Sequence, residues 1–122
     1  MSTPLLRPGR HRIADWLARP EEDRLELIDG SLVEKAAPDV DHGLAQAGVI
    51  HAVHGPFHRR SGGGRGGWWI VSEVDVQLGE NVFRPDVLGW RRDRVPVLPR
   101  ERPVTVRPDW ICEALSTTNP AN

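Results

Sequence analysis

Two short apolar runs in the second half of the chain, each interrupted by a single acid, constrain the fold more than any other feature. The first run covers residues 82–90 and contains Asp86, and the second covers residues 108–116 and contains Glu113. Both are rich in Val, Ile, Phe and Trp and are bounded by Pro and Gly, which predicts two β-strands. Because alternate side chains of a strand share a face, each acid falls on the apolar side of its strand.

A carboxylate on the apolar side of a strand is costly unless another group compensates its charge. Asp86 and Glu113 are 27 residues apart, on strands that we expect to be neighbours, so the two acids could meet at one point. The commonest compensation for converging carboxylates is a hard divalent cation. For either acid alone a simpler interpretation stays open: Asp after Pro is often a turn or strand-end residue, and a lone Glu in a strand usually faces solvent.

Composition narrows the class of protein. A chain of 122 residues is one domain at most, and 39% hydrophobic with 27% charged residues is typical of a soluble globular protein. The net charge of -1 provides no global basic field of the kind that marks nucleic-acid binders. A single cysteine, Cys112, excludes an internal disulfide and a multi-cysteine zinc site. No apolar run has membrane-spanning length and residues 1–10 lack a signal-peptide core, so we expect a cytoplasmic protein without a membrane partner.

The N-terminal half predicts a helix followed by a hairpin. We expect residues 1–11 to be a loose tail and residues 12–122 to form the domain. Ile13, Trp16 and Leu17 have the spacing of one helical face. Two apolar segments flank an Asp-Gly pair at residues 29–30, which predicts a tight hairpin turn.

Glu26 lies in the first strand of that hairpin, between apolar residues. It is a third candidate acid, although the pattern alone favours the exposed face of the strand.

A second helix should begin near His42, capped by Asp39 or Asp41, and should end or kink at the Gly-Pro pair of residues 55–56. We expect Ala45, Val49, Ala52 and Val53 to share its apolar face.

Four of the five histidines lie in this region. His51, His54 and His58 have the spacing of helical metal pairs, but no HExxH pattern is present, and we favour solvated histidines over a zinc site. His42, at the start of the helix, is kept as a possible site residue.

The remaining segments complete a mixed α/β layout. A Gly- and Arg-rich loop over residues 59–67 is followed by expected strands at 68–72 and 74–78, a turn, and then the strands that contain Asp86 and Glu113. We therefore expect one main sheet with helices packed on it. The last expected strand is the most apolar, and such a strand needs other elements packed on both of its faces. We therefore expect that the sequence stops before a C-terminal helix that would cover this strand. An uncovered terminal strand invites pairing, which makes a homodimer possible.

These blocks resemble a known nuclease family. The matching segments are Glu26-Leu27-Ile28-Asp29-Gly30 with Leu32-Val33-Glu34, then Pro38 and His42, then Arg84-Pro85-Asp86-Val87, then Pro108-Asp109-Trp110-Ile111-Cys112-Glu113-Ala114-Leu115-Ser116. In this order, over about residues 12–120, the chain resembles the bacterial Uma-two family of restriction endonucleases, a branch of the PD-(D/E)xK nuclease superfamily.

The resemblance implies a restriction-endonuclease-like mixed β-sheet flanked by helices, a Mg²⁺ or Mn²⁺ cofactor and DNA as substrate. Asp86 would be the metal-binding Asp of the Pro-Asp motif, and Glu113 would be the second acid and metal ligand. Glu26 would be an accessory catalytic acid. His42 matches a recurring family histidine whose role the resemblance does not assign.

The chain departs from the family at the catalytic lysine. In the superfamily pattern this lysine follows the second acid by two residues, where this chain has Leu115. In the Uma-two branch it lies further on, in a helix after the Leu-Ser block, whereas this sequence ends at Asn122. The one lysine, Lys35, lies in a different block. We therefore expect weak or absent nuclease activity from these residues.

Two alternative functions stay open. The chain could be a non-catalytic nuclease remnant that binds nucleic acid or a protein partner through its Arg-rich loops and an exposed sheet. A two-carboxylate glycosidase is a third possibility, which the short chain without pocket-scale insertions disfavours. Divalent-cation binding at Asp86 separates the nuclease from the remnant.

Overall fold

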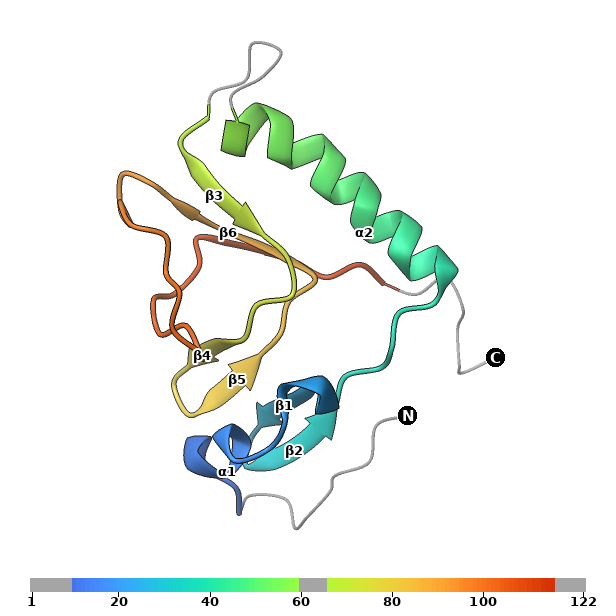
Figure 1. Cartoon of the computed structure of the whole chain (residues 1–122), viewed down its shortest axis with the longest axis vertical. Coiled ribbons are helices and arrows are strands. Elements are labelled where there is room, and N and C mark those ends of the chain that lie inside the picture. The colour runs from blue at the N-terminus through green and yellow to red at the C-terminus, as the bar shows by residue number, and fades with distance from the viewer. Residues whose placement is uncertain (1–9, 60–65, 116–122) are drawn as a thin grey trace. The chain divides into compact units, whose positions relative to one another are not determined.

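The computed structural model describes residues 10–59 and 66–115, and it has a mixed α/β fold (Figure 1). Most of the expected N-terminal tail, most of the Gly-rich loop and the last seven residues lie outside this part. The elements follow in this order: α1 (Ile13–Leu17), the 3₁₀ turn η1 (Glu21–Asp23), β1 (Leu25–Ile28), β2 (Ser31–Glu34), α2 (Val40–Val53), the π-helical turn η2 (His54–Arg59), β3 (Trp68–Val71), β4 (Val76–Leu78), β5 (Asn81–Phe83), β6 (Val87–Arg91) and β7 (Trp110–Cys112).

The described residues form two compact units. Within the described ranges, the first consists of residues 10–37, 75–84 and 101–107, and the second of residues 38–59, 66–74, 85–100 and 108–115. Among the described helices, none combines the length and the apolar character that crossing a bilayer requires.

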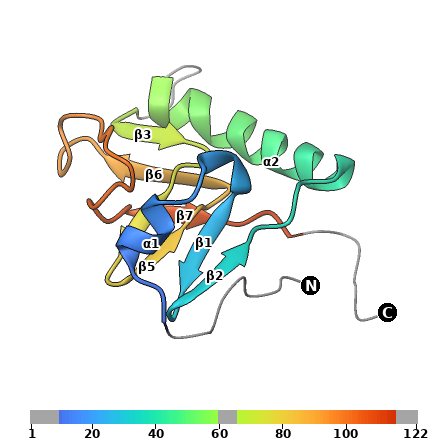
Figure 2. The ribbon, with the colours of Figure 1, turned by 60° about the horizontal axis from the view of Figure 1, so that its bottom comes forward.

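The first unit is an antiparallel sheet of order β2-β1-β5-β4 with α1 beside β1 (Figure 2). The predicted hairpin is confirmed: β1 and β2 pair over four residues, and Asp29 and Gly30 both have positive φ, as a tight Asp-Gly turn requires. The predicted helix is also confirmed, and Trp16 is buried with its indole N–H donating to the Leu25 carbonyl at 2.7 Å. Leu17, expected on the same buried face, is 47% exposed because α1 ends there after little more than one turn.

A buried ion pair lies in the same unit. Asp75 is 4% exposed and accepts a hydrogen bond from Arg102 Nε at 3.0 Å. Burial raises the pKa of the Asp75 carboxyl, while the neighbouring guanidinium groups of Arg84 and Arg102 act in the opposite direction and Glu21 adds to the rise. The net upward direction shows that desolvation outweighs the two cations.

The second unit is an antiparallel sheet of order β3-β6-β7 with α2 running alongside it (Figure 1). The predicted N-cap is confirmed at Asp39, whose side chain accepts the His42 N–H at 2.7 Å. The α-helix ends at Val53, two residues before Gly55-Pro56, and continues as the π-helical turn η2. No residue of α2 is fully buried, so the expected apolar face through Val49 is only partly covered.

The turn η2 is attached to β3 through His58. Its Nδ1 accepts the Ile70 N–H at 3.0 Å, and its ring stacks on His54 with the ring centres 4.2 Å apart. Burial lowers the pKa of His58, and the nearby His54, Arg92 and Arg59 lower it further. A ring nitrogen that accepts a backbone N–H carries no proton, which agrees with the direction of that shift.

The expectation of one main sheet is wrong, because the run of residues 82–90 divides between two sheets. β5 ends at Phe83 in the first unit, and β6 starts at Val87 in the second. Pro85 separates them: proline has no N–H for the ladder, and it restricts the residue before it. Asp86 therefore lies just before a strand and not within one.

Candidate functional site

Asp86 is a buried carboxylate at the start of β6, with 1% of the residue exposed. Its Oδ2 accepts the Ala114 N–H at 2.7 Å, from the segment that follows β7. Its Oδ1 lies 3.2 Å from Nε2 of His42, whose side chain is 17% exposed. A buried acid held from two sides in this way has a fixed orientation, which is what a ligand or catalytic carboxylate needs.

Helix α2 presents its polar residues to Asp86. His42 and Gln46 are four residues apart and therefore share one helical face. Gln46 Nε2 donates to the Asp86 carbonyl at 2.9 Å, while His42 contacts the Asp86 carboxylate. One turn of the helix thus holds both the main chain and the side chain of the same acid.

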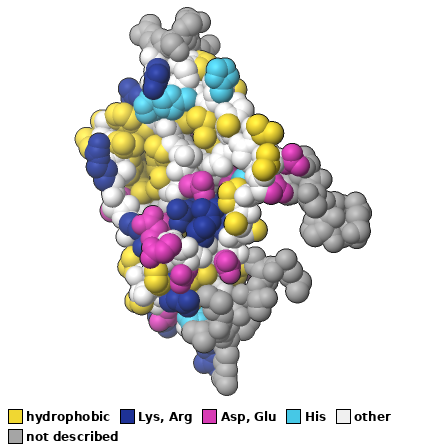
Figure 3. Space-filling model, turned by 45° about the vertical axis from the view of Figure 1, so that its right-hand side comes forward, with side chains coloured by type: hydrophobic (Ala, Val, Ile, Leu, Met, Phe, Trp, Pro, Cys, Tyr) yellow, Lys and Arg dark blue, Asp and Glu magenta, His cyan; other side chains and the backbone are white. Residues whose placement is uncertain are grey.

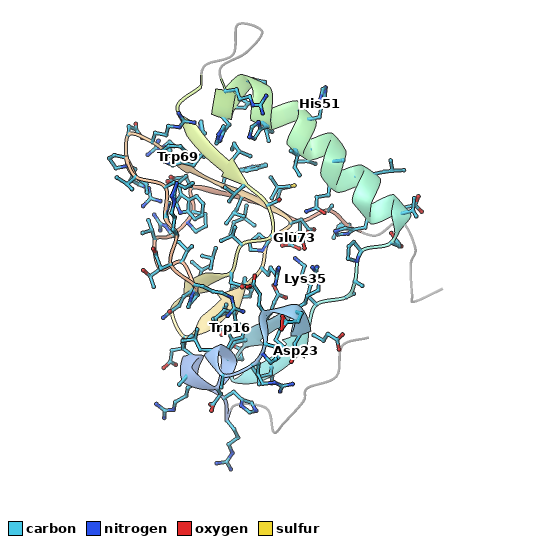
Figure 4. All side chains as sticks on the ribbon, viewed as in Figure 1. Trp16, Asp23, Lys35, His51, Trp69 and Glu73 are labelled. Atoms are coloured by element: carbon cyan, nitrogen blue, oxygen red, sulfur yellow. The ribbon has the colours of Figure 1, made fainter. Side chains whose placement is uncertain are left out.

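Gln46 also connects Asp86 to Glu73, a residue that the sequence patterns did not single out. Gln46 Nε2 lies 3.5 Å from Glu73 Oε2, and the Glu73 N–H donates to the Pro85 carbonyl at 3.1 Å. Glu73, labelled in Figure 4, has a φ of 54°, in the left-handed region that residues other than Gly, Asn and Asp seldom adopt. The signal for it in the sequence is faint: an acid between Val71 and Val74, resembling the acids in the two apolar runs.

The register of the sheet brings three acids to one end of it. Val71 pairs with Leu88 in β3 and β6, and two residues past the end of β3 the Glu73 N–H donates to the carbonyl of Pro85, the residue before Asp86. Val87 pairs with Cys112 in β6 and β7, so counting one residue further sets Glu113 opposite Asp86.

The side chain of Glu113 is exposed, however, and β7 ends at Cys112, so the prediction that Glu113 lies within a strand on a buried apolar face is wrong. The reason is that its expected neighbours on that face, Ile111 and Leu115, are themselves exposed.

Glu26 and Lys35 belong to the first unit, and both contact Arg84. Glu26 Oε2 accepts the Arg84 N–H at 2.7 Å, and the Lys35 ammonium donates to the Arg84 carbonyl. Glu26 is half-buried and hydrogen-bonded, in contrast to the solvent-facing alternative that its strand pattern favoured. Its contact shapes the main chain two residues before Asp86.

The chain has a second Pro-Asp pair, Pro108-Asp109, whose acid has a structural role. Asp109 accepts the Arg91 N–H at 2.8 Å and pairs with Arg94 Nε at 2.9 Å. Burial alone would raise the pKa of Asp109, but the hydrogen bonds from Arg91 and Arg94 and their charges bring it below the ordinary value. This carboxylate fastens the loop after β6 to the segment before β7.

The donor set around Asp86 suits a cation that keeps much of its hydration. Among residues 10–59 and 66–115, no three His, Cys, Asp or Glu side chains are close enough to enclose a metal ion. Magnesium does not require such an enclosure, because it is usually bound through one or two carboxylates together with waters and substrate phosphates. Asp86, fixed and buried at the end of β6, with acids at the ends of β3 and β7, fits that requirement.

Comparison with known proteins agrees with this fold. The chain has a mixed α/β fold that it shares with the crystal structure described as "a putative nuclease belonging to DUF820 from Anabaena variabilis ATCC 29413", with which it aligns with a TM-score of 0.70. The two are 20% identical, and the alignment covers 90% of this chain and 62% of that chain, so this chain spans less than two thirds of its structural neighbour. No curated protein matches the sequence.

The family model Uma2, described as "Putative restriction endonuclease", matches residues 11–122. The chain therefore belongs to this family, as the motifs in its sequence predict.

Proposed function

We propose that residues 12–122 form a metal-dependent endonuclease domain that hydrolyses phosphodiester bonds, with DNA as substrate. Membership of the family supports this proposal. The observation that carries it is the state of Asp86, the acid of the first Pro-Asp pair: it is buried and is oriented by Ala114 and His42. A cytoplasmic location follows from the same proposal, since the substrate is intracellular nucleic acid.

Asp86 and Glu113 are the proposed ligands of Mg²⁺ or Mn²⁺, and Glu26 is the proposed accessory acid. Such an ion, when bound, lowers the pKa of a water nucleophile and neutralises charge on the phosphate. The chain's own residues hold the site in place. Ala114 N–H and His42 keep the Asp86 carboxylate from turning, and Gln46 fixes its main chain.

We expect these 122 residues to cleave DNA slowly or not at all. The resemblance requires a lysine near the second acid, and Leu115 occupies the position two residues after Glu113. The ammonium group of Lys35 donates to the Arg84 carbonyl in the first unit. If no lysine ammonium group orients the attacking water, the site can still bind a metal ion while the rate of DNA cleavage falls.

Calorimetric titration with Mn²⁺ tests the proposal without depending on cleavage. The unchanged chain should bind Mn²⁺ saturably and Asp86→Asn should abolish binding. Asp109→Asn is the matched control: it changes the other Pro-Asp acid, which is engaged by Arg94, and should leave binding intact. Absence of binding by the folded, unchanged chain would refute the metal site and favour a non-catalytic nucleic-acid-binding or protein-interaction module.

A further inference from the structure

His42 and Asp86 bring a ring nitrogen and a carboxylate oxygen close together. Nε2 of His42 lies 3.2 Å from Oδ1 of Asp86, and the two side chains are 17% and 2% exposed. The second oxygen of Asp86 accepts the Ala114 N–H at 2.7 Å, so Oδ1 is the oxygen that faces the ring. A histidine this close to a proposed metal-binding acid either orients the acid only or shares its metal ion.

The separation of the two atoms suits one shared cation. Carboxylate oxygens and imidazole nitrogens bind divalent ions at about 2.0–2.2 Å. Two donor atoms 3.2 Å apart, each at such a distance from one ion, subtend an angle of about 95° at that ion. Neighbouring ligands of an octahedral ion subtend about 90°, so His42 and Asp86 can bind one ion with little movement of either side chain.

Both donors are held by hydrogen bonds of the main chain around them. The His42 N–H donates to Asp39 Oδ1 at 2.7 Å, which fixes the backbone of His42 in the first turn of α2. Gln46, one turn further, donates to the Asp86 carbonyl at 2.9 Å and so ties the helix to the start of β6. The distance between the ring and the carboxylate is therefore set before an ion binds, as a preorganised metal site requires.

The histidines at the C-terminal end of α2 differ from His42. His54 and His58 stack on each other, but Nδ1 of His58 accepts the Ile70 N–H at 3.0 Å. In a neutral ring whose Nδ1 is an acceptor, Nε2 carries the proton and has no lone pair for a metal ion. His51 is exposed and points away from the sheet in Figure 4, and histidine surface is visible at this end of the helix in Figure 3. A test of His42 must therefore separate it from these accessible side chains.

We propose that His42 binds the metal ion directly, together with Asp86, and makes the site selective for a first-row transition cation such as Mn²⁺ over Mg²⁺. Imidazole suits transition cations, whereas Mg²⁺ binds oxygen ligands and gives up its waters reluctantly. One aspartate and one histidine leave coordination positions for waters and for a substrate phosphate. This inference rests on the proposed function, in which the choice between Mg²⁺ and Mn²⁺ is open and His42 only orients Asp86.

Electron paramagnetic resonance of Mn²⁺ with the full chain tests the proposal. Loss of the free-ion signal during titration gives the dissociation constant, and Mg²⁺ added as a competitor gives the preference between the two ions. We expect Mn²⁺ to bind about tenfold or more tightly than Mg²⁺. The electron spin-echo modulation of the bound ion should contain the ¹⁴N frequencies of a coordinated imidazole. This signature is measured on the unchanged chain, so it does not depend on the folding of a variant.

Two histidine variants assign the nitrogen. His42→Gln should remove the ¹⁴N modulation and weaken Mn²⁺ binding by about tenfold or more, because loss of even a partner of a metal ligand usually has an effect of that size. The same variant should change Mg²⁺ binding by less than about twofold, since Mg²⁺ makes little use of a nitrogen ligand. Glutamine is favoured three residues after an N-cap, so the start of α2 is kept. His51→Gln is the matched control: it makes the same change at an exposed histidine of the same helix and should leave both measurements unaltered.

Different results overturn the inference and the proposed function. Mn²⁺ binding that Asp86→Asn abolishes, but that shows no ¹⁴N modulation or keeps its full affinity in His42→Gln, would overturn the inference and leave the proposed function standing. Loss of the ¹⁴N modulation in His51→Gln, or equal affinity for Mg²⁺ and Mn²⁺, would also overturn the inference. Absence of Mn²⁺ binding by the folded, unchanged chain would overturn both.

Discussion

Gly89 in β6 is the position where the smallest change should have a large effect on the sheet that carries Asp86. A Cβ at Gly89 would lie 2.8 Å from Ile70 Cδ1 and 2.9 Å from the Trp69 carbonyl oxygen. Ile70 can turn away, but the carbonyl belongs to β3, which pairs with β6 over four residues. Ordinary contact begins at 3.4 Å, so Gly89→Ala must separate the strands by about half an ångström.

We expect Gly89→Ala to reduce the free energy of unfolding by about 2 kcal/mol, within the range for overpacked cores. For a chain of this size that corresponds to a midpoint about 5–10 °C lower in thermal denaturation followed by circular dichroism. Gly43→Ala is the control: with open space around a helical glycine, it should raise stability by about 0.5–1 kcal/mol.

A double variant tests the cause of the loss. Ile70→Val removes the Cδ1 atom that the new methyl would meet, and on its own it should cost about 1 kcal/mol. In the Gly89→Ala background the same change should cost less, because it relieves one of the two close contacts. Strictly additive costs, or a loss below about 0.5 kcal/mol for Gly89→Ala, would refute the steric argument.

Three further predictions concern charge and capping. The pKa of His58 is lower in the folded state than its ordinary value of 6.5, so the folded chain binds fewer protons than the unfolded chain just below that pH, and the free energy of unfolding should fall as the pH drops below 6.5. His58→Asn keeps an acceptor for the backbone N–H and should flatten this pH dependence in urea titrations. Burial raises the pKa of the Asp75 carboxyl above its ordinary value of 3.8, so the free energy of unfolding should decline as the pH rises above 3.8, and Asp75→Asn should remove that decline. An unchanged pH dependence of the free energy of unfolding in the variant would contradict the role of burial. Asp39→Ala should cost about 1 kcal/mol through loss of the α2 N-cap, and a loss no larger than that of Asp41→Ala would contradict the cap assignment.

Features decided by adjacent residues could be predicted from the sequence. The hairpin follows from Asp29-Gly30, since few other pairs adopt positive φ without strain. The start of α2 follows from Asp39, whose side chain reaches the N–H three residues on. Both depend on chemistry within a few residues, and both are found where the sequence places them.

Strand partners and helix faces could not be predicted in the same way. Residues 82–90 form a continuous apolar run, and the sequence does not show that its halves join different sheets on either side of Pro85. The periodicity of α2 was also ambiguous, because the helix has apolar residues both toward the sheet and away from it. In each case the answer depends on contacts between distant segments.

The candidate site shows the same division. Asp86 could be identified as a candidate because its motif is local, and His42 because it lies in the first turn of the helix that a local cap defines. Glu73 and Gln46 could not, because their connection to Asp86 depends on the register of β3 and β6 and on the docking of α2. Glu113 was identified by its motif, yet its side-chain exposure depends on where β7 ends.

The most direct test of the central claim is paramagnetic broadening of ¹H–¹⁵N NMR signals during titration with Mn²⁺. If Asp86 is the centre of a metal site, the backbone amide signals of Ala114, His42 and Gln46 should broaden first, and Asp86→Asn should remove the effect. Broadening centred on the His54–His58 pair, or an unchanged Ala114 signal at saturating Mn²⁺, would contradict the claim.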